Sequence, residues 1–360
     1  MNEQKTVVVA MSGGVDSSVA AALMVEQGYR VVGMMLRLWS EPGQAYANRC
    51  CTPDAMAQAR RVASMLGIPF YAVDGREKFR QQVVQSFLDG YVAGVTPNPC
   101  LVCNRHIRWG LLLKHAQALG ADYMATGHYA QVRRGEDGRF ELWQGIDEHK
   151  DQSYVLSGLN QEQLAHTLLP LGEMEKPMVR QQAHQFQLPV AERPDSQDLC
   201  FLGNADYRQF LVRHAPEATN PGQIVTRDGA VLGQHEGLAF YTIGQRKGLG
   251  IASEQPLYVL EKDLRSNRLV VGEAGDLGRR DMRVAQMNWI AGEAPQPSFR
   301  AQVKIRYKAL LAWAEVNVAP DGAIRVLFDQ PVRDITPGQL AVFYQDRRVL
   351  GGGLIQAVAA

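Results

Sequence analysis

The sequence predicts an α/β protein with an amino-terminal, doubly wound parallel sheet, followed by a small central domain and a carboxy-terminal β-barrel. Strand-like and helix-like segments alternate over the first 130 residues, which is typical of a parallel sheet with helices on both faces. Glycine-rich short runs fill residues 219–280, and strictly alternating strands dominate from about residue 281. We therefore expect domains at 1–205, 206–280 and 281–360.

The amino-terminal elements follow from periodicity and from signals that end helices. An apolar run over 5–11 predicts the first strand, and helical periodicity over 15–27 ends at Gly28. Ligands of such sheets bind beyond the carboxyl ends of the strands. Ser12-Gly13-Gly14 and Thr126-Gly127-His128 follow predicted strands, so we expect a ligand site there. The other predicted strands are 30–38, 70–73 and 121–129, and the other predicted helices are 53–66, 77–91 and 105–119.

Composition and charge exclude several classes of function. The 360 residues carry a net charge of +1, so any nucleic acid must be held by local basic patches rather than by the overall field. The polar start of the chain and the lack of a long apolar run predict a cytoplasmic protein without a membrane partner. Five cysteines, an odd number in a chain of this length, do not fit a secreted disulfide framework.

The stretch VVAMSGGVDSS, residues 8–18, predicts a strand, a glycine turn and a helix start. Consecutive glycines let backbone N–H groups approach a ligand, and a helix amino terminus favours an anion. The serine hydroxyls suit a phosphate, and Asp16 suits a Mg²⁺ ion that bridges phosphates. The Gly-Lys-Ser/Thr of a Walker A loop is absent. The alternative interpretation is an ordinary strand–helix turn with a serine cap.

Two separated cysteines, Cys103 and Cys200, indicate sulfur chemistry on this fold. The Pro-Asn-Pro segment at 97–99 is expected to be non-helical, with the helix beginning near Arg105. Cys103 would then lie beside a helix start, where the helix dipole and nearby arginines favour its thiolate.

The glycine turn resembles the SGGxDS pyrophosphate loop of the ATP pyrophosphatases, whose fold is like that of the adenine nucleotide alpha hydrolases. Further segments extend the resemblance along the whole chain to the bacterial tRNA-specific 2-thiouridylase family. These segments are AMSGGVDSS, TPNPCLVCN, ATGHYA, KDQSYVL, DSQDLCF, TIGQRKGLG and TPGQLAVFY.

The resemblance implies a tRNA-uridine 2-sulfurtransferase that acts on the wobble uridine of the tRNAs for Lys, Glu and Gln. ATP would adenylate the uridine 2-oxygen and release pyrophosphate. Cys200 would carry a persulfide delivered by a sulfur-relay protein or a cysteine desulfurase, and Cys103 would be the nucleophile. A transient Cys103–Cys200 disulfide would remain and need reduction before the next turnover.

The resemblance also assigns the nucleotide site. A core leucine at position 36 needs no ligand, so the alternative of a purely structural Leu36 stays open. The implied ATP-binding residues are Ala10, Met11, Ser12, Gly13, Gly14, Val15, Asp16, Ser17, Leu36 and Gly127.

The implied tRNA contacts lie in several segments. The motif KIRYK is expected to place Lys304, Arg306 and Lys308 on one face of a strand, although a solvated strand face has the same pattern. His128 could equally be a satisfied polar residue at a strand end. The implied residues are Asn98, Pro99 and Cys100 around the target base, and His128, Lys150, Asp151, Gln152, Arg306, Tyr307 and Gln339 elsewhere.

Cys100 departs from the family pattern, because some members have Asp at this position as a candidate general acid or base. The Cys100-x-x-Cys103 pair together with Cys200 could instead ligate an iron–sulfur cluster or zinc, which we regard as the less favoured alternative. The adjacent Cys50 and Cys51 suit one metal poorly and are interpreted as structural or incidental.

Two rival functions stay open on the sequence. An amide-forming ATP pyrophosphatase of the same fold would need an ammonia source and no essential cysteine pair. A non-catalytic RNA-binding protein with a relic nucleotide site would bind tRNA without using ATP.

Overall fold

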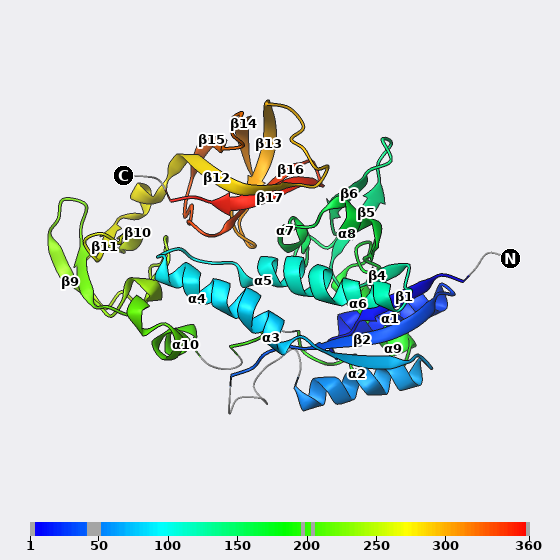
Figure 1. The fold of residues 1–360 in the computed structure, drawn as a ribbon. Coiled ribbons are helices and arrows are strands. Elements are labelled where there is room, and N and C mark those ends of the chain that lie inside the picture. The colour runs from blue at the N-terminus through cyan, green and yellow to red at the C-terminus, as the bar shows by residue number, and fades with distance from the viewer. Residues whose placement is uncertain (1–3, 42–51, 196–198, 203–205, 358–360) are drawn as a thin grey trace.

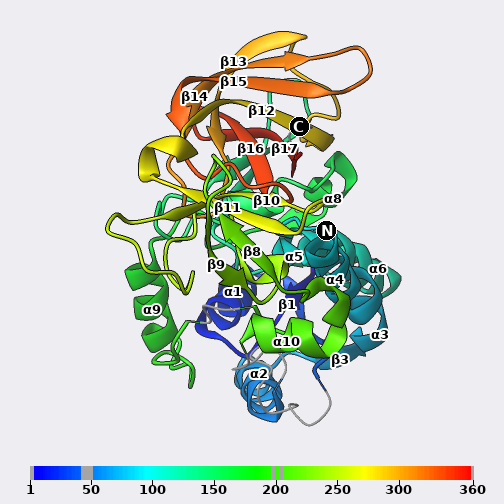
Figure 2. The ribbon, with the colours of Figure 1, turned by 90° about the vertical axis from the view of Figure 1, so that its left-hand side faces the viewer.

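The computed structural model describes residues 4–41, 52–195, 199–202 and 206–357, so Cys50 and Cys51 lie outside the described residues. The parallel sheet and its helices form one end of the molecule, and the central strands form the other (Figure 1). The barrel lies above helices α4 and α5 in this view, and a quarter turn shows the central strands below the barrel and in front of the parallel sheet (Figure 2).

The predicted parallel sheet is present, with strand order β3-β2-β1-β4-β7 and every pairing parallel. The strand predicted over 121–129 shortens to three residues, so Gly127 and His128 lie beyond its end, and β7 has no counterpart in the prediction. The strands are β1 (Thr6–Ala10), β2 (Arg30–Arg37), β3 (Phe70–Asp74), β4 (Tyr123–Ala125) and β7 (Thr167–Leu168).

Helices cover both faces of this sheet, which confirms the doubly wound prediction. Val7 and Val9 of β1 are buried in one apolar cluster with residues of α1, α2 and α9, whereas Val8 points into a cluster with η2 and α6. Each fully buried side chain of this size contributes about 1.5–3 kcal/mol to folding. These helices are α1 (Val15–Glu26), α2 (Pro53–Met65), α9 (Lys176–Gln185), the π-helical η2 (Cys103–Leu112) and α6 (Leu113–Ala118).

The helix predicted to start near Arg105 starts six residues earlier, so that prediction is wrong. Helix α5 (Pro99–Val102) runs directly into η2 and α6. Pro99 takes the first helical position, where a backbone N–H is not needed. Asn98 caps the helix by accepting a hydrogen bond from the Leu101 N–H at 3.2 Å. The preceding helical segment, predicted over 77–91, comprises α3 (Arg76–Phe79), the π-helical η1 (Arg80–Val84) and α4 (Gln85–Val92).

A hairpin from the first 150 residues joins the carboxy-terminal sheet. Strand β5 (Ala130–Arg134) pairs with β6 (Phe140–Gln144), and β6 pairs with β17 through Arg348 and Val349. This extension crosses the expected domain division through long-range pairing. The short helices α7 (Ser153–Leu156) and α8 (Gln161–Ala165) follow the hairpin.

The central part contains a small sheet in the order β10-β11-β8-β9, in which β8 and β11 are parallel. Helix α10 is tied to the segment after β2, because Arg213 and His214 both contact the Glu41 carboxylate, at 2.8 and 3.0 Å. The elements are α10 (Tyr207–His214), η3 (Pro216–Ala218), β8 (Gly222–Val225), β9 (Val231–His235), η4 (Leu238–Phe240), β10 (Tyr258–Asp263), β11 (Arg268–Gly272) and η5 (Ala274–Leu277).

The carboxy-terminal strands form the predicted barrel, in the order β12-β15-β14-β13-β16-β17, which is closed by pairing of β12 with β17. Strand β13 ends at Lys304, so Arg306 and Lys308 lie in the turn that follows, and the predicted basic stripe along one strand is wrong. The strands are β12 (Arg279–Trp289), β13 (Ser298–Lys304), β14 (Ala312–Val318), β15 (Ile324–Val332), β16 (Leu340–Gln345) and β17 (Arg348–Ile355).

The barrel reaches the loop that leads into α5. The Gln339 side-chain amide donates to the carbonyls of Thr96 and Pro97, at 3.0 and 3.4 Å. The Thr96 N–H in turn donates to the Pro337 carbonyl at 2.9 Å. Within the described residues, no helix combines the length and apolar character needed to span a membrane.

Candidate active site

The glycine turn between β1 and α1 is braced by its own serines. The buried Ser17 hydroxyl accepts a hydrogen bond from the Ser12 N–H at 3.1 Å, and the buried Ser18 hydroxyl donates to the Gly14 carbonyl at 2.8 Å. Gly13 has a φ of +72°, a left-handed conformation that favours glycine. Ser12 is exposed at the tip of the turn. The turn is therefore rigid and presents small, polar groups to a ligand.

Gly127 brings the end of β4 against the amino terminus of α1. A Cβ atom at position 127 would lie 2.7 Å from the Asp16 carbonyl carbon and 2.8 Å from the Ser17 nitrogen. Only a residue without a side chain fits this approach. The two polar stretches that the sequence places after strand ends therefore meet, as predicted for a ligand site at the edge of the sheet.

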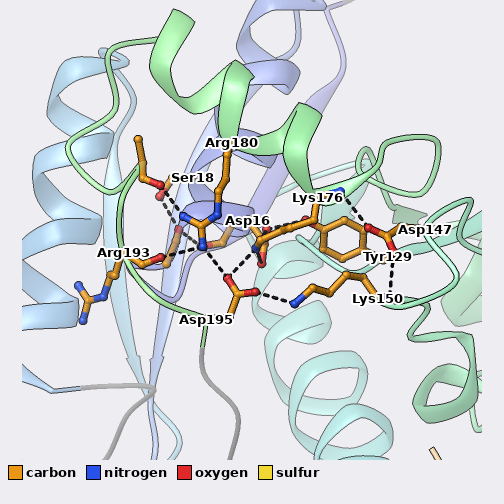
Figure 3. Close-up of polar contacts among 12 residues, drawn as sticks. Asp16, Ser18, Tyr129, Asp147, Lys150, Lys176, Arg180, Arg193 and Asp195 are labelled. Atoms are coloured by element: carbon orange, nitrogen blue, oxygen red, sulfur yellow. Dashed lines mark hydrogen bonds and ion pairs between the residues drawn. The ribbon is translucent and has the colours of Figure 1, made fainter. Parts of the chain in front are cut away.

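An ion-pair network surrounds Asp16 (Figure 3). The Lys176 ammonium lies 2.7 and 2.9 Å from the two Asp16 carboxylate oxygens and 2.9 Å from an Asp195 oxygen. Asp195 also pairs with Lys150 at 2.7 Å and with Arg180 at 3.1 Å. The network therefore links α1, α9 and the segment that leads to Cys200.

The network fixes the protonation of two of its members. Burial raises the pKa of Asp195, but the hydrogen bonds and charges of Lys150 and Lys176 outweigh burial and lower this pKa to about 2. Burial and the neighbouring Asp16 carboxylate raise the pKa of Tyr129 far above its usual value. The Tyr129 hydroxyl thus stays protonated and donates to Asp16 at 2.7 Å.

Leu36, the expected adenine contact, lies near the carboxyl end of β2. Its side chain is half-buried and packs against two of the apolar clusters. A Cβ atom on Gly75 would lie 3.3 Å from its Cδ2. Packing against these clusters and against Gly75 thus fixes the Leu36 side chain. Its contact with adenine stays a prediction.

Cys103 and Cys200 belong to one apolar region, although they are far apart in the chain. Cys103 begins η2 and is buried in a cluster with residues of α4 and α10, and the half-buried Cys200 packs against the same cluster. Phe201, next to Cys200, anchors this segment through edge contacts with Phe87 and Phe210, at ring distances of 5.2 and 5.8 Å. The structure therefore brings the two predicted sulfur residues into one apolar environment.

Cys100, in contrast, is exposed and lies in the first turn of α5. The correction of the helix start thus gives the position nearest the helix amino terminus to Cys100 rather than to Cys103. Among the described residues, no group of three or more His, Cys, Asp or Glu side chains is arranged to hold a metal ion. The iron–sulfur or zinc alternative for Cys100, Cys103 and Cys200 stays a prediction from the sequence.

The residues expected around the target base lie where the barrel meets α5. Pro99 is buried and Cys100 is exposed beside it. Burial raises the pKa of Tyr307, and the charges of Asp151 and Cys100 raise it further. Gln339 holds the loop just before Asn98 through the two carbonyls described above. A catalytic-domain loop and the barrel thus form one surface.

Two other residues expected to contact tRNA, Arg306 and His128, form ion pairs or hydrogen bonds with other residues of this protein. Arg306 pairs with Asp334 at 2.5 Å. His128 is buried, and its Nε2 accepts from Arg108 at 2.9 Å while Nδ1 donates to Thr126 Oγ1 at 2.7 Å. Burial and the Arg108 charge lower the pKa of His128 well below its usual value, so the ring is neutral.

The side chains of the KDQ segment at 150–152 make two kinds of contact, an ion pair and hydrogen bonds to backbone N–H groups. Lys150 extends to Asp195 in the ionic network. Asp151 is 3% exposed and accepts from the backbone N–H groups of Gly145 and Ser153. The Gln152 side-chain oxygen accepts from the Tyr129 N–H at 3.1 Å. Lys150 is the member of this segment that joins the ionic network around Asp16 (Figure 3).

Comparison with known proteins assigns the family. The tRNA methyl transferase HUP domain family matches residues 5–204, the tRNA methyl transferase PRC-barrel domain family matches 208–273, and the Aminomethyltransferase beta-barrel domain family matches 279–355. The tRNA-specific 2-thiouridylase MnmA of Magnetococcus marinus is 49% identical over 99% of this chain and 100% of its own length. The chain belongs to the tRNA-specific 2-thiouridylase family. The proteins of the same name from Moorella thermoacetica and Carboxydothermus hydrogenoformans are 49% and 46% identical, over 98% of this chain and 99% and 98% of their lengths.

Sequence reasoning about this 2-thiouridylase family member missed the partners of Asp16. Tyr129 and Lys176 contact Asp16 directly, and Asp195 and Arg180 extend the network around it. Tyr129 and Asp195 lie in the segments ATGHYA and DSQDLCF, but no local pattern in those segments predicts the pairing. One signal was present: Lys176 occupies the first position of α9, where the positive end of the helix dipole disfavours a cation. A cation kept at that position points to a partner outside the helix.

Proposed function

We propose that this protein replaces the 2-oxygen of the wobble uridine in tRNA with sulfur, in a reaction that consumes ATP. The observation that carries the proposal is identity of nearly one half with 2-thiouridylases over almost the whole chain. The placement of Cys103 and Cys200 against one apolar cluster supports it. The tRNAs for Lys, Glu and Gln are the substrates expected from the family resemblance.

The first half-reaction activates the uridine oxygen. That oxygen attacks the α-phosphorus of ATP, the bond to the β-phosphate oxygen breaks, and pyrophosphate leaves with the electron pair. The turn from Ala10 to Ser17 and the backbone at Gly127 would hold the phosphates, because their N–H groups and hydroxyls suit an anion. The apolar Leu36 side chain would lie against adenine.

Asp16 is the carboxylate of the turn and the residue that would hold Mg²⁺. Carboxylate oxygens are the ligands that this ion prefers, and a bound ion would neutralise phosphate charge. Both Asp16 oxygens lie within 2.9 Å of Lys176, so the ion would share this carboxylate with the ammonium.

The second half-reaction replaces the activated oxygen with sulfur. The terminal sulfur of a Cys200 persulfide attacks C2, and AMP leaves with the former 2-oxygen. Cys103 then attacks the Cys200 sulfur, which releases the 2-thiouridine and leaves a Cys103–Cys200 disulfide. If Cys103 attacks first, hydrogen sulfide is released and attacks C2, and the same disulfide results. Two electrons from an external thiol restore the enzyme, and a sulfur-relay protein or cysteine desulfurase supplies the next persulfide.

The surface at α5 and the barrel would receive the tRNA. The target base must leave the anticodon stack to reach the cysteines. Asn98, Pro99 and Cys100 would surround it, and Tyr307 can stack on a splayed base. The remaining expected contacts are His128, Lys150, Asp151, Gln152, Arg306 and Gln339.

One assay tests this function. The full chain is incubated with unmodified tRNA for Lys, Glu or Gln, ATP, Mg²⁺ and a persulfide donor, and the digested nucleosides are analysed by mass spectrometry. We expect 2-thiouridine derivatives that depend on ATP. Their absence would overturn the proposal.

The same assay separates the rival functions. An amide-forming enzyme would consume ATP with ammonia and would tolerate loss of both cysteines. A non-catalytic RNA-binding protein would retain tRNA without hydrolysing ATP. Equal tRNA binding by wild type and by Asp16→Asn, with no ATP consumed by either, would favour that last function.

A further inference from the structure

The three described cysteines differ in how far they are exposed to solvent. Cys103 is 9% exposed and buried in an apolar cluster, and the half-buried Cys200 packs against that cluster. Cys100, in the first turn of α5, is exposed. A disulfide between Cys103 and Cys200 would therefore form among apolar side chains, whereas Cys100 presents a thiol at the surface.

Cys100 and Cys103 lie one helical turn apart. The Cys103 N–H donates to the carbonyls of Pro99 and Cys100, which closes the turn between the two cysteines. Residues three positions apart on a helix have Cα atoms about 5 Å apart, within the range of about 4.4–6.8 Å that a disulfide needs. Their Cβ atoms must approach by about 1–2 Å, which a change within this first turn of α5 can supply. The two sulfurs can thus be joined without moving the rest of the helix.

The proposed reaction ends in a state that cannot accept more sulfur. The Cys103–Cys200 disulfide occupies the Cys200 sulfur, which must be a thiol before it can carry the next persulfide. Reduction by an external thiol alone would begin with an attack on a sulfur that is buried or half-buried. A thiol of the same chain replaces this encounter with an intramolecular step, which is fast because the reacting groups are already held together.

We propose that Cys100 is a resolving thiol that regenerates Cys200 and moves the disulfide to the surface. The inference rests on the proposed sulfur transfer, which supplies the Cys103–Cys200 disulfide. The Cys100 thiolate attacks the Cys103 sulfur, the Cys100–Cys103 bond forms and the Cys103–Cys200 bond breaks. Cys200 leaves with the electron pair and takes up a proton in place of the one that Cys100 lost.

The second step reduces the new disulfide from outside. An external dithiol attacks the exposed Cys100 sulfur, and Cys103 leaves as a thiolate. The second thiol of the reductant then displaces Cys100, so two electrons enter and the reductant becomes a disulfide. Because Cys100 is also expected beside the target base, the exchange would follow release of the thiolated tRNA.

The role requires a thiol at position 100. Some family members have Asp there, and a carboxylate cannot take part in disulfide exchange. Cys100→Asp therefore separates the exchange from any acid–base task at this position, and Cys100→Ser removes the thiol with the least change in size.

The first measurement identifies the disulfide. The full chain is loaded with persulfide from a polysulfide, freed of small thiols and given tRNA and ATP for one turnover without reductant. Acid then stops exchange by protonating the thiolates, the remaining thiols are alkylated, and the peptides are analysed by mass spectrometry. We expect wild type to contain a Cys100–Cys103 disulfide together with alkylated Cys200, and both variants to contain only the Cys103–Cys200 disulfide. Absence of the Cys100–Cys103 disulfide from wild type would overturn the inference.

The second measurement compares later turnovers with the first. With a limiting concentration of dithiothreitol, the ratio of the steady-state rate to the first-turnover rate should fall about tenfold or more in Cys100→Ser and Cys100→Asp, because the intramolecular step is lost. The ratio cancels any effect of these variants on binding of the target base. A purely structural role for Cys100 would leave the ratio unchanged and would exclude the relay. Cys51→Ser is the control and should keep the wild-type ratio.

Failure of the proposed function looks different. If wild type forms neither 2-thiouridine nor a disulfide that includes Cys200 or Cys103, the proposed sulfur transfer is wrong. If wild type forms 2-thiouridine and a Cys103–Cys200 disulfide, and the variants keep its ratio of rates, the function stands and the role of Cys100 falls.

Discussion

The glycine turn at Ser12–Gly14 and the pair Cys103 and Cys200 both lie within residues 5–204, but the turn has charged surroundings and the cysteines have apolar surroundings. Around Asp16, charged side chains from several elements pair within 3.1 Å of one another. Around Cys103 and Cys200, phenylalanine rings and aliphatic side chains fill the space. In the proposed function, the first region would bind the phosphates of ATP and the second would carry the sulfur.

This contrast fits what each half-reaction of the proposed function would need. Departing pyrophosphate must be neutralised, and preorganised charges do this without reorganisation. A persulfide and an activated uridine must be kept from water, which would otherwise hydrolyse the adenylated intermediate. A single mixed environment would serve neither step well. Damage to the cysteine region should therefore leave the first half-reaction intact, and damage to the ionic region should leave the reactivity of the cysteines intact.

The largest expected effect is that of Cys200→Ser. Thiolation should fall by about a thousandfold or more, because in the proposed mechanism Cys200 carries the persulfide and no other described cysteine would replace it. ATP-dependent release of pyrophosphate in a single turnover should persist, because the ionic region is untouched. Nucleoside analysis and a pyrophosphate assay on the same samples measure both. Cys51→Ser serves as a thiol control, and thiolation retained in Cys200→Ser would break the comparison.

Gly127→Ala should damage the ionic region first. The added methyl group would lie 2.7 Å from the Asp16 carbonyl carbon, so the start of α1 must shift. A displacement of this kind costs about a hundredfold in rate. Pyrophosphate release should fall by that amount, whereas alkylation of Cys200 by a small thiol reagent should proceed at the wild-type rate.

Gly275→Ala is the matched control, because its Cβ would meet open space. It should keep both properties. If Gly127→Ala released pyrophosphate at the wild-type rate, the close approach of β4 to α1 would not matter for nucleotide use.

The local part of this architecture could be predicted from the sequence. Periodicity and glycine signals predicted the parallel sheet, and the residues around Gly13 predicted the tight turn after β1, because a turn depends on its own neighbouring residues. The anion site at this turn stays a prediction. The helix start at Pro99 was misjudged, since proline was taken to break a helix that it in fact begins. The strand expected to include KIRYK ends at Lys304, because alternation of side chains does not determine where hydrogen bonding to the neighbouring strand stops.

The long-range part could not be predicted. The pairing of Arg348 with Trp143 joins segments about 200 residues apart and leaves no local trace. The same holds for Lys176 and Asp16, which are 160 residues apart. Which charged residues pair depends on how distant segments come together, so local sequence does not predict the partners. An apolar cluster needs only hydrophobic residues of suitable size.

Gln339→Leu should produce a smaller effect at the surface where barrel and α5 meet. Two hydrogen bonds to the loop before Asn98 would be lost, each worth about 0.5–1.5 kcal/mol, so kcat should fall about tenfold. If Gln339 positions this loop, the Kd for tRNA stays near the wild-type value. If it instead contacts tRNA, the Kd rises and kcat does not change. Gln356→Leu, which removes one local bond to the Leu354 carbonyl, is the control.

The smallest effect concerns stability, and it separates the ionic from the apolar region by pH. Burial opposes ionisation of Asp195, but Lys150 and Lys176 lower its pKa from 3.8 to about 2. A carboxyl with a depressed pKa stabilises the fold above its unfolded pKa, and this contribution is lost as the pH falls toward the folded value. Asp195→Asn should therefore cost about 2 kcal/mol at neutral pH.

The cost of Asp195→Asn should be constant between about pH 6 and 8 and shrink below about pH 4, where Asp195 of the unfolded chain begins to take up a proton while that of the folded protein stays ionised. Urea unfolding at several pH values measures it. Phe201→Leu, in the apolar region, provides the contrast, because its cost comes from lost packing and should not depend on pH. A pH-independent cost for Asp195→Asn would mean that its ion pairs add nothing to stability, and the distinction between the two regions would then rest on chemistry alone.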